Sequence, residues 1–361
     1  MTNEAAVPTR HKEYSLALAL LAAVVIFFLN DASSLTGLVF VNALATVSIL
    51  FSASSVVRHA DVLAHRFGEP FGSLILSLAI VVLEVGLISI LMLSGSASQS
   101  LMRDTIYSVV IIVMTGFIGF SLLLGGYRYE TQSFTLAGIK HYLIAIIPLS
   151  LIILVLPACM DSRAFSSGQL VVVAITCIAM YAVFLHVQTV THQDFFIYEE
   201  EDGDEGHGHP SSHSSARHFA YLLVHLVAVM GITKLNSLSL YSLLNLFDAP
   251  PAVAGFLVAL LILSPEGVGA FRSVWHNRVQ RTMNLFLGSV LATISVTVPV
   301  VIVVAMLTGQ TLEMGLAFPD ILLLFATFLV CQTSLTGGET NMHSGVAHVV
   351  LFLVYLMLLF R

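Results

Sequence analysis

Stretches of about 20 largely apolar residues recur along almost the whole of this 361-residue chain. A helix needs about 20 such residues to cross ~30 Å of hydrocarbon, so each stretch predicts a membrane-spanning helix. Only 10% of the residues are charged, against about 25% in a typical soluble domain, which excludes a water-soluble enzyme. The sequence therefore predicts an all-α polytopic membrane protein. The stretches lie at residues 14–30, 36–57, 73–93, 105–125, 141–157, 168–191, 218–235, 252–271, 283–307, 319–333 and 342–360, eleven in all.

The charge balance and the cysteines exclude two further classes. Fourteen Lys and Arg residues against 21 Asp and Glu residues give a net charge of −7, the wrong sign for a nucleic-acid-binding surface. The three cysteines have no C-x-x-C spacing and form neither a disulfide framework nor a thiolate metal site. We expect no bound cofactor. The expected partners are membrane lipid and small ions.

One polar segment, residues 192–217, interrupts the apolar pattern. Between residues 199 and 213 it carries six carboxylates and three histidines among Ser, Gly and Pro, and the segment has too few apolar residues to fold alone. We interpret it as a flexible cytoplasmic linker between two halves of five helices each. An odd number of spans per half predicts that the halves are inverted repeats. The predicted regions are an N-terminal segment 1–13, a leading helix 14–30, a first repeat 31–191, the linker 192–217 and a second repeat 218–361.

The distribution of basic residues predicts the orientation. With the N-terminus in the cytoplasm, ten of the fourteen Lys and Arg residues fall on the cytoplasmic side and four on the outside. Positive charge accumulates in cytoplasmic loops, so this arrangement is favoured. With eleven spans, the C-terminus then lies outside.

Two glutamates lie well inside apolar stretches. Glu84 is near the middle of the third predicted span and Glu266 is in the eighth, at corresponding points of the two halves. An ionisable residue in a span costs about 2.5–3.5 kcal/mol on insertion, which makes it a functional candidate by default. Pro265 cannot donate a hydrogen bond to the Leu261 carbonyl, so we expect it to bend or break the eighth helix and to free a backbone oxygen beside Glu266.

The alternative for a single glutamate is a protonated residue hydrogen-bonded between helices. Two symmetric glutamates favour one shared site, where two ionised carboxylates would repel each other and lose hydration. They are stable when protonated or when neutralised by a cation, so protons and cations compete for them. Hard cations take oxygen ligands, six to eight for Ca²⁺. Candidate ligands besides Glu84 and Glu266 are the Leu261 carbonyl and the hydroxyls of Ser289 and Thr293, although membrane hydroxyls are more often packing groups.

Three segments carry a resemblance to a known family: SASSVVRHADVLAHRFGEPFGSLILSLAIVVLEVGLIS, LILSPEGVGAF and RTMNLFLGSVLATISVTVPVV. Over essentially the whole chain the sequence resembles the bacterial ChaA-type cation/proton antiporters. These belong to the calcium/proton exchanger branch of the calcium:cation antiporter superfamily. The resemblance implies eleven helices in two inverted repeats, the bacterial cytoplasmic (inner) membrane, a periplasmic C-terminus, and exchange of Ca²⁺, Na⁺ or K⁺ for H⁺. These ions are transported substrates.

The sequence also departs from this family's pattern. Typical members carry Gly-Asn-x-x-Glu in each repeat, and Glu84 and Glu266 match its glutamates. The first Gly-Asn position is Ile80-Val81 here, and the second repeat reads Leu263-Ser264-Pro265-Glu266. The missing amides and glycines favour a looser site that also accepts Na⁺ or K⁺. The resemblance also places Glu69 at the cytoplasmic entrance, where a solvated loop carboxylate is an equally good interpretation.

Three alternative functions remain at the level of sequence. The linker histidines resemble those of zinc transporters, although the membrane histidines His186, His225 and His348 are isolated on separate predicted helices and favour interhelical hydrogen bonds or a proton path. A cation channel would share the buried carboxylates but would not move protons against the cation. A membrane hydrolase is disfavoured because the chain has no G-x-S-x-G or H-E-x-x-H motif.

Overall fold

The computed structural model describes residues 14–29, 34–67, 71–94, 98–161, 163–196, 214–335 and 337–361. Within these residues, nine helices are long and apolar enough to cross a membrane, and two shorter apolar helices lie at Tyr14–Leu29 and Leu78–Leu93. Together they correspond to the eleven predicted spans and confirm the all-α polytopic architecture. The first half contains α1 (Tyr14–Leu29), α2 (Leu35–Phe67), α3 (Phe71–Leu93), α4 (Leu101–Ile111), η1 (Ile112–Phe117), α5 (Ile118–Tyr129), α6 (Leu136–Ser150), η2 (Leu151–Val155), η3 (Leu156–Cys159), α7 (Ser167–His186), η4 (Val187–Thr191) and η5 (Gln193–Phe195).

The second half repeats this organisation without a leading helix. Its elements are α8 (Ser215–Leu246), α9 (Pro251–Trp275), α10 (Val279–Ala292), η6 (Thr293–Thr297), α11 (Val298–Thr308), α12 (Phe318–Leu335) and α13 (Met342–Leu359). One feature was not predicted: β1 (Thr131–Ser133) pairs antiparallel with β2 (Glu339–Asn341). This short pair joins the end of α5 to the start of α13.

Helices α2 and α8 are longer than predicted. Their apolar stretches end at residues 57 and 235, whereas the helices end at Phe67 and Leu246. A helix satisfies its own backbone hydrogen bonds in any surroundings, so a polar sequence does not end it. In α8 the polar residues are paired with α2: Asn236 donates to the Asn42 side chain at 3.0 Å, and Asn42 donates to the Ser239 carbonyl at 3.1 Å.

The predicted effect of Pro265 on the backbone is only partly right. Helix α9 runs without interruption from Pro251 to Trp275, so Pro265 does not break it. In the turn before Pro265, the Ser264 hydroxyl donates a hydrogen bond to the Leu260 carbonyl. Neighbouring helices and Ser or Thr side chains commonly allow proline inside membrane helices in this way.

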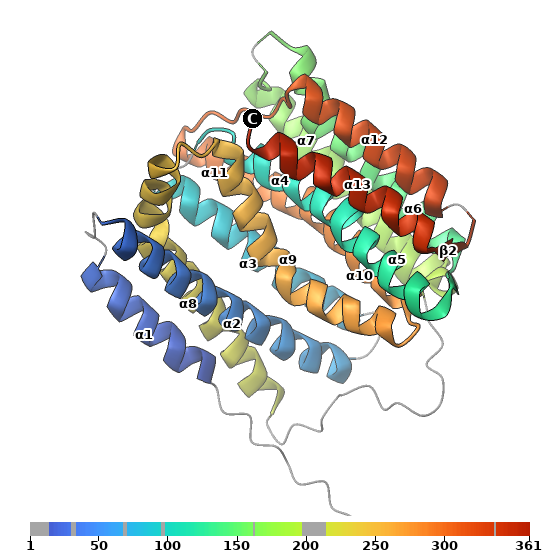
Figure 1. Cartoon of the computed structure of the whole chain (residues 1–361), viewed down its shortest axis with the longest axis horizontal. Helices are drawn as coiled ribbons and strands as arrows, with labels where there is room; N and C mark the ends of the chain where they lie inside the picture. Colours follow the sequence, from blue (N-terminus) through green and yellow to red (C-terminus); the bar gives the residue numbers. More distant parts are fainter. Residues whose placement is uncertain are drawn as a thin grey trace, which may run out of the picture.

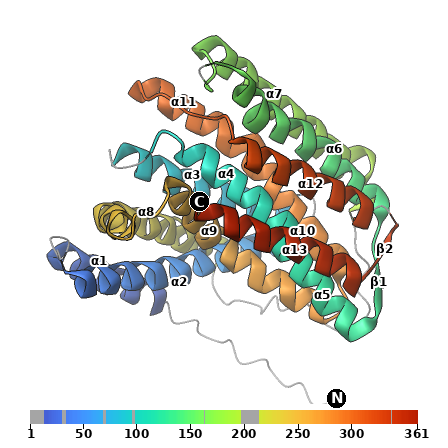
Figure 2. The same ribbon diagram turned by 45° about the horizontal axis from the view of Figure 1, so that its top comes forward.

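The helices form one bundle with a deeply buried centre (Figures 1 and 2). Helices α1, α2 and α8 pack together along one edge, and α6 and α7 lie at the opposite side. Helices α3, α4, α9 and α10 lie between these groups. Here α3 contacts α8 and α9, and α4 contacts α9. Nearly all of α4 and η1 is buried, as is most of α10 and η6.

Both central long helices contain a π-helical turn at mid-length. One turn is η1, between α4 and α5, and the other is η6, between α10 and α11. A π turn widens the helix by one residue and changes the direction of the side chains after it, and such turns are frequent at functional sites. The polar groups that these turns expose can therefore face the helices α3 and α9 that carry the two glutamates.

Candidate functional site

Glu84 lies on α3 in the interior of the bundle and is 0% exposed. Two hydroxyls of η6 donate to the same carboxylate oxygen, Oε2: Thr293 Oγ1 at 2.7 Å and Thr297 Oγ1 at 3.1 Å. The other oxygen, Oε1, has no hydrogen-bond partner among the described residues. Thr293 was expected from the sequence. Thr297 was missed, although its spacing of four residues from Thr293 places both hydroxyls on one helix face.

Glu266 lies on α9 and is 3% exposed. Neither of its carboxylate oxygens has a hydrogen-bond partner in the described part of the chain. Ser289, on α10, lies beside this carboxyl group without making a hydrogen bond of normal geometry. Glu84 is close enough to act on Glu266 electrostatically. The fold thus brings together Glu84, Glu266, Ser289 and Thr293, which are far apart in the sequence.

Three carboxylate oxygens in this site are therefore buried and unpaired within the described residues. A buried polar atom without a hydrogen-bond partner costs about 1–3 kcal/mol, and a buried charge costs more. Protons on the carboxyl groups would remove the cost of the charge, and a bound cation would also give the unpaired oxygens a partner. The oxygen-only donor set of carboxylates and hydroxyls fits a hard cation such as Ca²⁺, Na⁺ or K⁺.

Close packing separates Glu266 from the lipid-facing surface. A Cβ atom on Gly267 would lie 2.9 Å from the tip of the Phe117 ring, so a larger residue here would require that ring to shift. The Phe117 ring contacts the rings of Phe271 and Phe286, with centroids 5.6 and 5.4 Å away. On the same helix, Gly255 allows the α4 backbone to approach closely. These contacts pack η1, α4 and α10 against the helix that carries Glu266.

Two further candidate ligands have less direct support. Leu261 lies half-buried on α9, one residue after the carbonyl that Ser264 occupies. Pro265 has no N–H to bind the Leu261 carbonyl, so that oxygen lacks its usual helical donor. Glu69 and the carboxylates and histidines of residues 199–213 lie outside the described residues.

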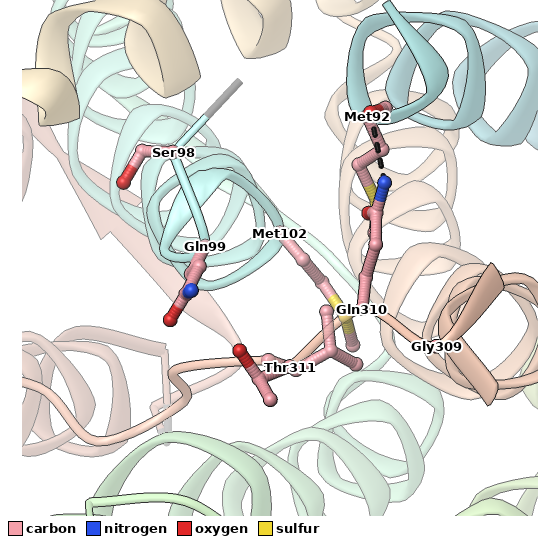
Figure 3. Close-up of a pocket in the computed structure, with 8 residues that line it drawn as sticks. Met92, Ser98, Gln99, Met102, Gly309, Gln310 and Thr311 are labelled. Atoms are coloured by element: carbon pink, nitrogen blue, oxygen red, sulfur yellow. Dashed lines mark hydrogen bonds between the residues drawn. The ribbon is translucent and has the colours of Figure 1, made fainter. Parts of the chain in front are cut away.

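A cavity of about 280 Å³ lies at the end of α3, between the segments that precede α4 and follow α11. Its lining is mixed, with Ser98, Gln99, Gln310 and Thr311 supplying polar groups. Figure 3 shows Gln310 extended toward α3, where its amide donates to the Met92 carbonyl at 3.1 Å. Met92 is eight residues after Glu84, which is ~12 Å along a helix. Helix α3 therefore runs from the carboxylate site to this cavity, and α11 runs to it from η6.

An ionic network adjoins this cavity. Arg103 contacts Asp104 and Glu313, each at 2.8 Å, and also donates to the Gly315 carbonyl at 3.0 Å. Ser100 donates to the second oxygen of Asp104 at 2.7 Å. The network ties the start of α4 to the segment between α11 and α12.

The histidines predicted to be isolated have different surroundings. His186 is exposed on α7. His348 is buried and lies 2.7 Å from Ser334 Oγ and 2.6 Å from the Met114 carbonyl of η1, which confirms an interhelical role. His225 also makes an interhelical contact, to Ser15, but its predicted isolation is wrong because its ring lies near that of His59. Sequence periodicity does not reveal which residues of different helices meet.

The described residues contain no group of three or more His, Cys, Asp or Glu side chains with metal-binding geometry.

Comparison with known proteins gives consistent matches over nearly the whole chain. The family model described as "Sodium/calcium exchanger protein" matches residues 37–190 and 217–361, one stretch on each side of the linker. The chain is 54% identical to "Sodium-potassium/proton antiporter ChaA" of Escherichia coli over 98% of both chains. It is 36% identical to "Putative ionic transporter y4hA" of Sinorhizobium fredii, over 92% of this chain and 88% of that one.

Solved structures with low sequence identity share the fold. The native YfkE structure, described in a related form as a Ca²⁺/H⁺ antiporter, superposes with a TM-score of 0.75 at 16% identity, covering 96% of this chain and 98% of that one. The H⁺/Ca²⁺ exchanger CAX gives a TM-score of 0.68 at 16% identity, covering 97% and 89%. These two matches, of which YfkE scores higher, show a common helical architecture.

Proposed function

Because this chain belongs to the sodium/calcium exchanger protein family, we propose that it is a secondary active antiporter exchanging Ca²⁺, Na⁺ or K⁺ for protons. The observation that carries the proposal is the pair of buried glutamates, Glu84 and Glu266. They come from different halves, Glu84 acts electrostatically on Glu266, and the pair retains three unpaired carboxylate oxygens among the described residues. The relative from Escherichia coli is named as a sodium-potassium/proton antiporter, which supports the monovalent ions.

In this mechanism, protons and cations compete for one site. Two adjacent ionised carboxylates are unstable in a dry interior, so the site holds either protons or a cation. A cation entering the site displaces protons, and protons entering from the other side displace the cation. Coupling follows because the empty, doubly ionised site is the state of highest energy and is rarely formed.

The other oxygen groups complete the proposed ligand set. Thr293 and Thr297 hold Glu84 Oε2 and leave Oε1 available as a ligand oxygen. Ser289 and the Leu261 carbonyl would supply further oxygens on the Glu266 side. The Gly-Asn pairs of typical family members are absent, so the first coordination shell has no side-chain amide at those positions. This favours a site that accepts Na⁺ and K⁺ as well as Ca²⁺.

The cavity beside Met92 and Gln310 is the proposed outer approach to the site. We place the N-terminus in the cytoplasm and the C-terminus in the periplasm, on the distribution of Lys and Arg, with the protein in the bacterial cytoplasmic membrane. In this orientation the cavity faces the periplasm. The two halves, residues 31–191 and 218–361, then form inverted repeats around the glutamates.

Measurement of ΔpH in everted membrane vesicles tests this function. CaCl₂, NaCl or KCl added separately to energised vesicles should each collapse the pH gradient in wild-type vesicles, at a rate that saturates with cation concentration. Vesicles lacking the protein are the control. A channel would pass the cation without moving protons, and a zinc transporter would respond to Zn²⁺ alone. Either result would overturn the proposal.

A further inference from the structure

Three histidines gather between α2 and α8, apart from the glutamate pair. His59, on α2, and His218 and His225, on α8, are 3%, 4% and 0% exposed. The ring of His59 lies 5.1 Å from that of His218 and 5.7 Å from that of His225, measured between centroids. The cluster sits near the C-terminal end of α2 and the N-terminal end of α8, where the chain leaves the linker. None of these residues takes part in the mechanism above.

The contact between His59 and His218 limits how many protons the pair can hold. Their two Nδ1 atoms are 2.9 Å apart, so one ring must donate and the other must accept. The donor ring can be neutral or carry an extra proton without losing this bond. A second extra proton would occupy the accepting Nδ1, remove the bond and place two positive charges face to face. The packed helices therefore accept one proton at this pair and reject the second.

His225 can bind a proton by a different route. Its Nδ1 is 2.7 Å from the Tyr221 carbonyl, which only accepts, so Nδ1 carries a hydrogen. Its Nε2 is 2.8 Å from Ser15 Oγ, which is 2.9 Å from Ser55 Oγ, and Ser55 donates to the Phe51 carbonyl at 3.1 Å. With His225 neutral, Ser15 donates to Nε2. With His225 protonated, Nε2 donates to Ser15 and Ser15 to Ser55, so every group stays paired.

Several charged groups surround the cluster. Arg58 donates to Ser55 at 3.4 Å, and Arg217 donates to the Tyr221 hydroxyl at 3.3 Å, so positive charge already lies close to the histidines. The remaining titratable or charged side chains described on these helices and on those packed against them are Tyr14 on α1, Asp61 and Arg66 on α2, Glu84 on α3, Lys234 and Tyr241 on α8, Glu266 and Arg272 on α9, and His276 just after α9.

We propose that His59, His218 and His225 form a second proton-binding site, and that a second extra proton on the His59–His218 pair at acid pH loosens the packing of α2 on α8 and slows exchange. Histidine changes charge between about pH 5 and 8, which suits this role. Helix α2 also packs on α3 and α9, so a change in its packing reaches both glutamate-bearing helices. The effect on exchange rests on the proposed antiporter function, whereas the effect on helix packing does not.

The test uses purified full-length protein and two measurements. The first is the rate of cation-driven proton movement in proteoliposomes from pH 5.5 to 8.5. We expect His59→Asn and His218→Asn to extend activity by at least about half a pH unit toward acid, with the alkaline rate within about twofold of wild type. His186→Asn, at an exposed histidine of α7, is the matched control and should follow the wild-type profile.

The second measurement is the thermal unfolding midpoint over the same pH range. The unfolded chain binds the second proton that the packed pair rejects, so the wild-type midpoint should fall as the pH decreases. This slope should be shallower in His59→Asn and His218→Asn, and either variant suffices if the other does not insert. Wild-type slopes in both variants, or unchanged transport profiles, would overturn the proposal. If the wild-type protein moves no protons at any pH, the antiporter function fails, and the unfolding slopes still decide the proton site.

Discussion

The two halves of the molecule present the same elements around Glu84 and Glu266 but use them differently. Thr115 follows Glu84 by 31 residues, and Thr297 follows Glu266 by the same number. Each threonine lies in the π turn of its own half, η1 or η6. Thr297 donates across the bundle to Glu84, whereas Thr115 donates to the Ile111 carbonyl of its own helix at 2.6 Å.

The π turns η1 and η6 also differ in what their polar groups bind. The Met114 carbonyl in η1 is occupied by His348 of α13. In η6, Thr293 and Thr297 donate hydrogen bonds to Glu84. The buried Ser295 hydroxyl has no hydrogen-bond partner in the described residues. Glu84 is therefore held by hydroxyls, whereas Glu266 is not. We infer that Glu266 is the carboxylate on which protons and cations first replace each other, with Glu84 as the pre-oriented partner.

The largest expected effect comes from removing either charge. Glu84→Gln and Glu266→Gln keep the side-chain shape but carry no negative charge and cannot take up or release a proton. Exchange in everted vesicles should therefore fall to background in both. Glu339→Gln, at an exposed strand position, is the matched control. A wild-type rate in one glutamate variant would show that the site belongs to one half alone.

At acid pH, protons should occupy both carboxyl groups, so Glu84 and Glu266 should no longer differ as cation ligands. As the pH rises, fewer protons compete and apparent cation affinity should increase, by up to about tenfold per pH unit for each competing proton. The half-saturating concentration of Na⁺, K⁺ or Ca²⁺ should be measured from pH 6 to 9. A constant value would indicate separate sites for protons and cations.

Removing single hydroxyls sharpens the comparison directly. Hydrogen bonds to charged groups contribute about 1.5–3 kcal/mol, equivalent to roughly tenfold or more in affinity. Thr297→Val should weaken cation affinity by about that factor, since it leaves Glu84 Oε2 with one donor. Thr115→Val removes the corresponding hydroxyl of the other half and should change affinity less than about threefold. Equal losses would mean that the two halves exchange roles during transport and that both threonines serve the site.

The smallest effect is expected from the linker between the halves. Deletion of residues 199–213 removes six carboxylates and three histidines but no intramembrane ligand. Exchange should persist, with cation affinity reduced by no more than a few-fold at low salt, because exposed charges are screened over ~8–10 Å. Complete loss of exchange in a correctly inserted deletion would move the essential site to the linker and favour a zinc-handling function.

The sequence predicted the fold and singled out Glu84 and Glu266 as candidates, because both kinds of signal can be read from a short stretch of residues. A span is recognised by its length, and Glu84 and Glu266 stand out because a carboxylate is costly among apolar residues. The ends of α2 and α8 were missed because both helices continue into polar residues, and a buried one such as Asn236 resembles a loop residue until its partner Asn42 on the other helix is known. Thr297 and the histidine cluster were missed for a related reason, since contacts across helices depend on the rotation of each helix.

Proton release on cation binding tests the central claim most directly, because it needs no transport. Purified wild-type protein in weakly buffered detergent at pH 7.5 is mixed with NaCl, KCl or CaCl₂, and the released protons are measured with a pH-sensitive dye. We expect saturable release from wild type, matching its cation affinity, and strongly reduced release from both Glu84→Gln and Glu266→Gln. Wild-type release from both variants would show that protons and cations do not compete for this pair of carboxylates.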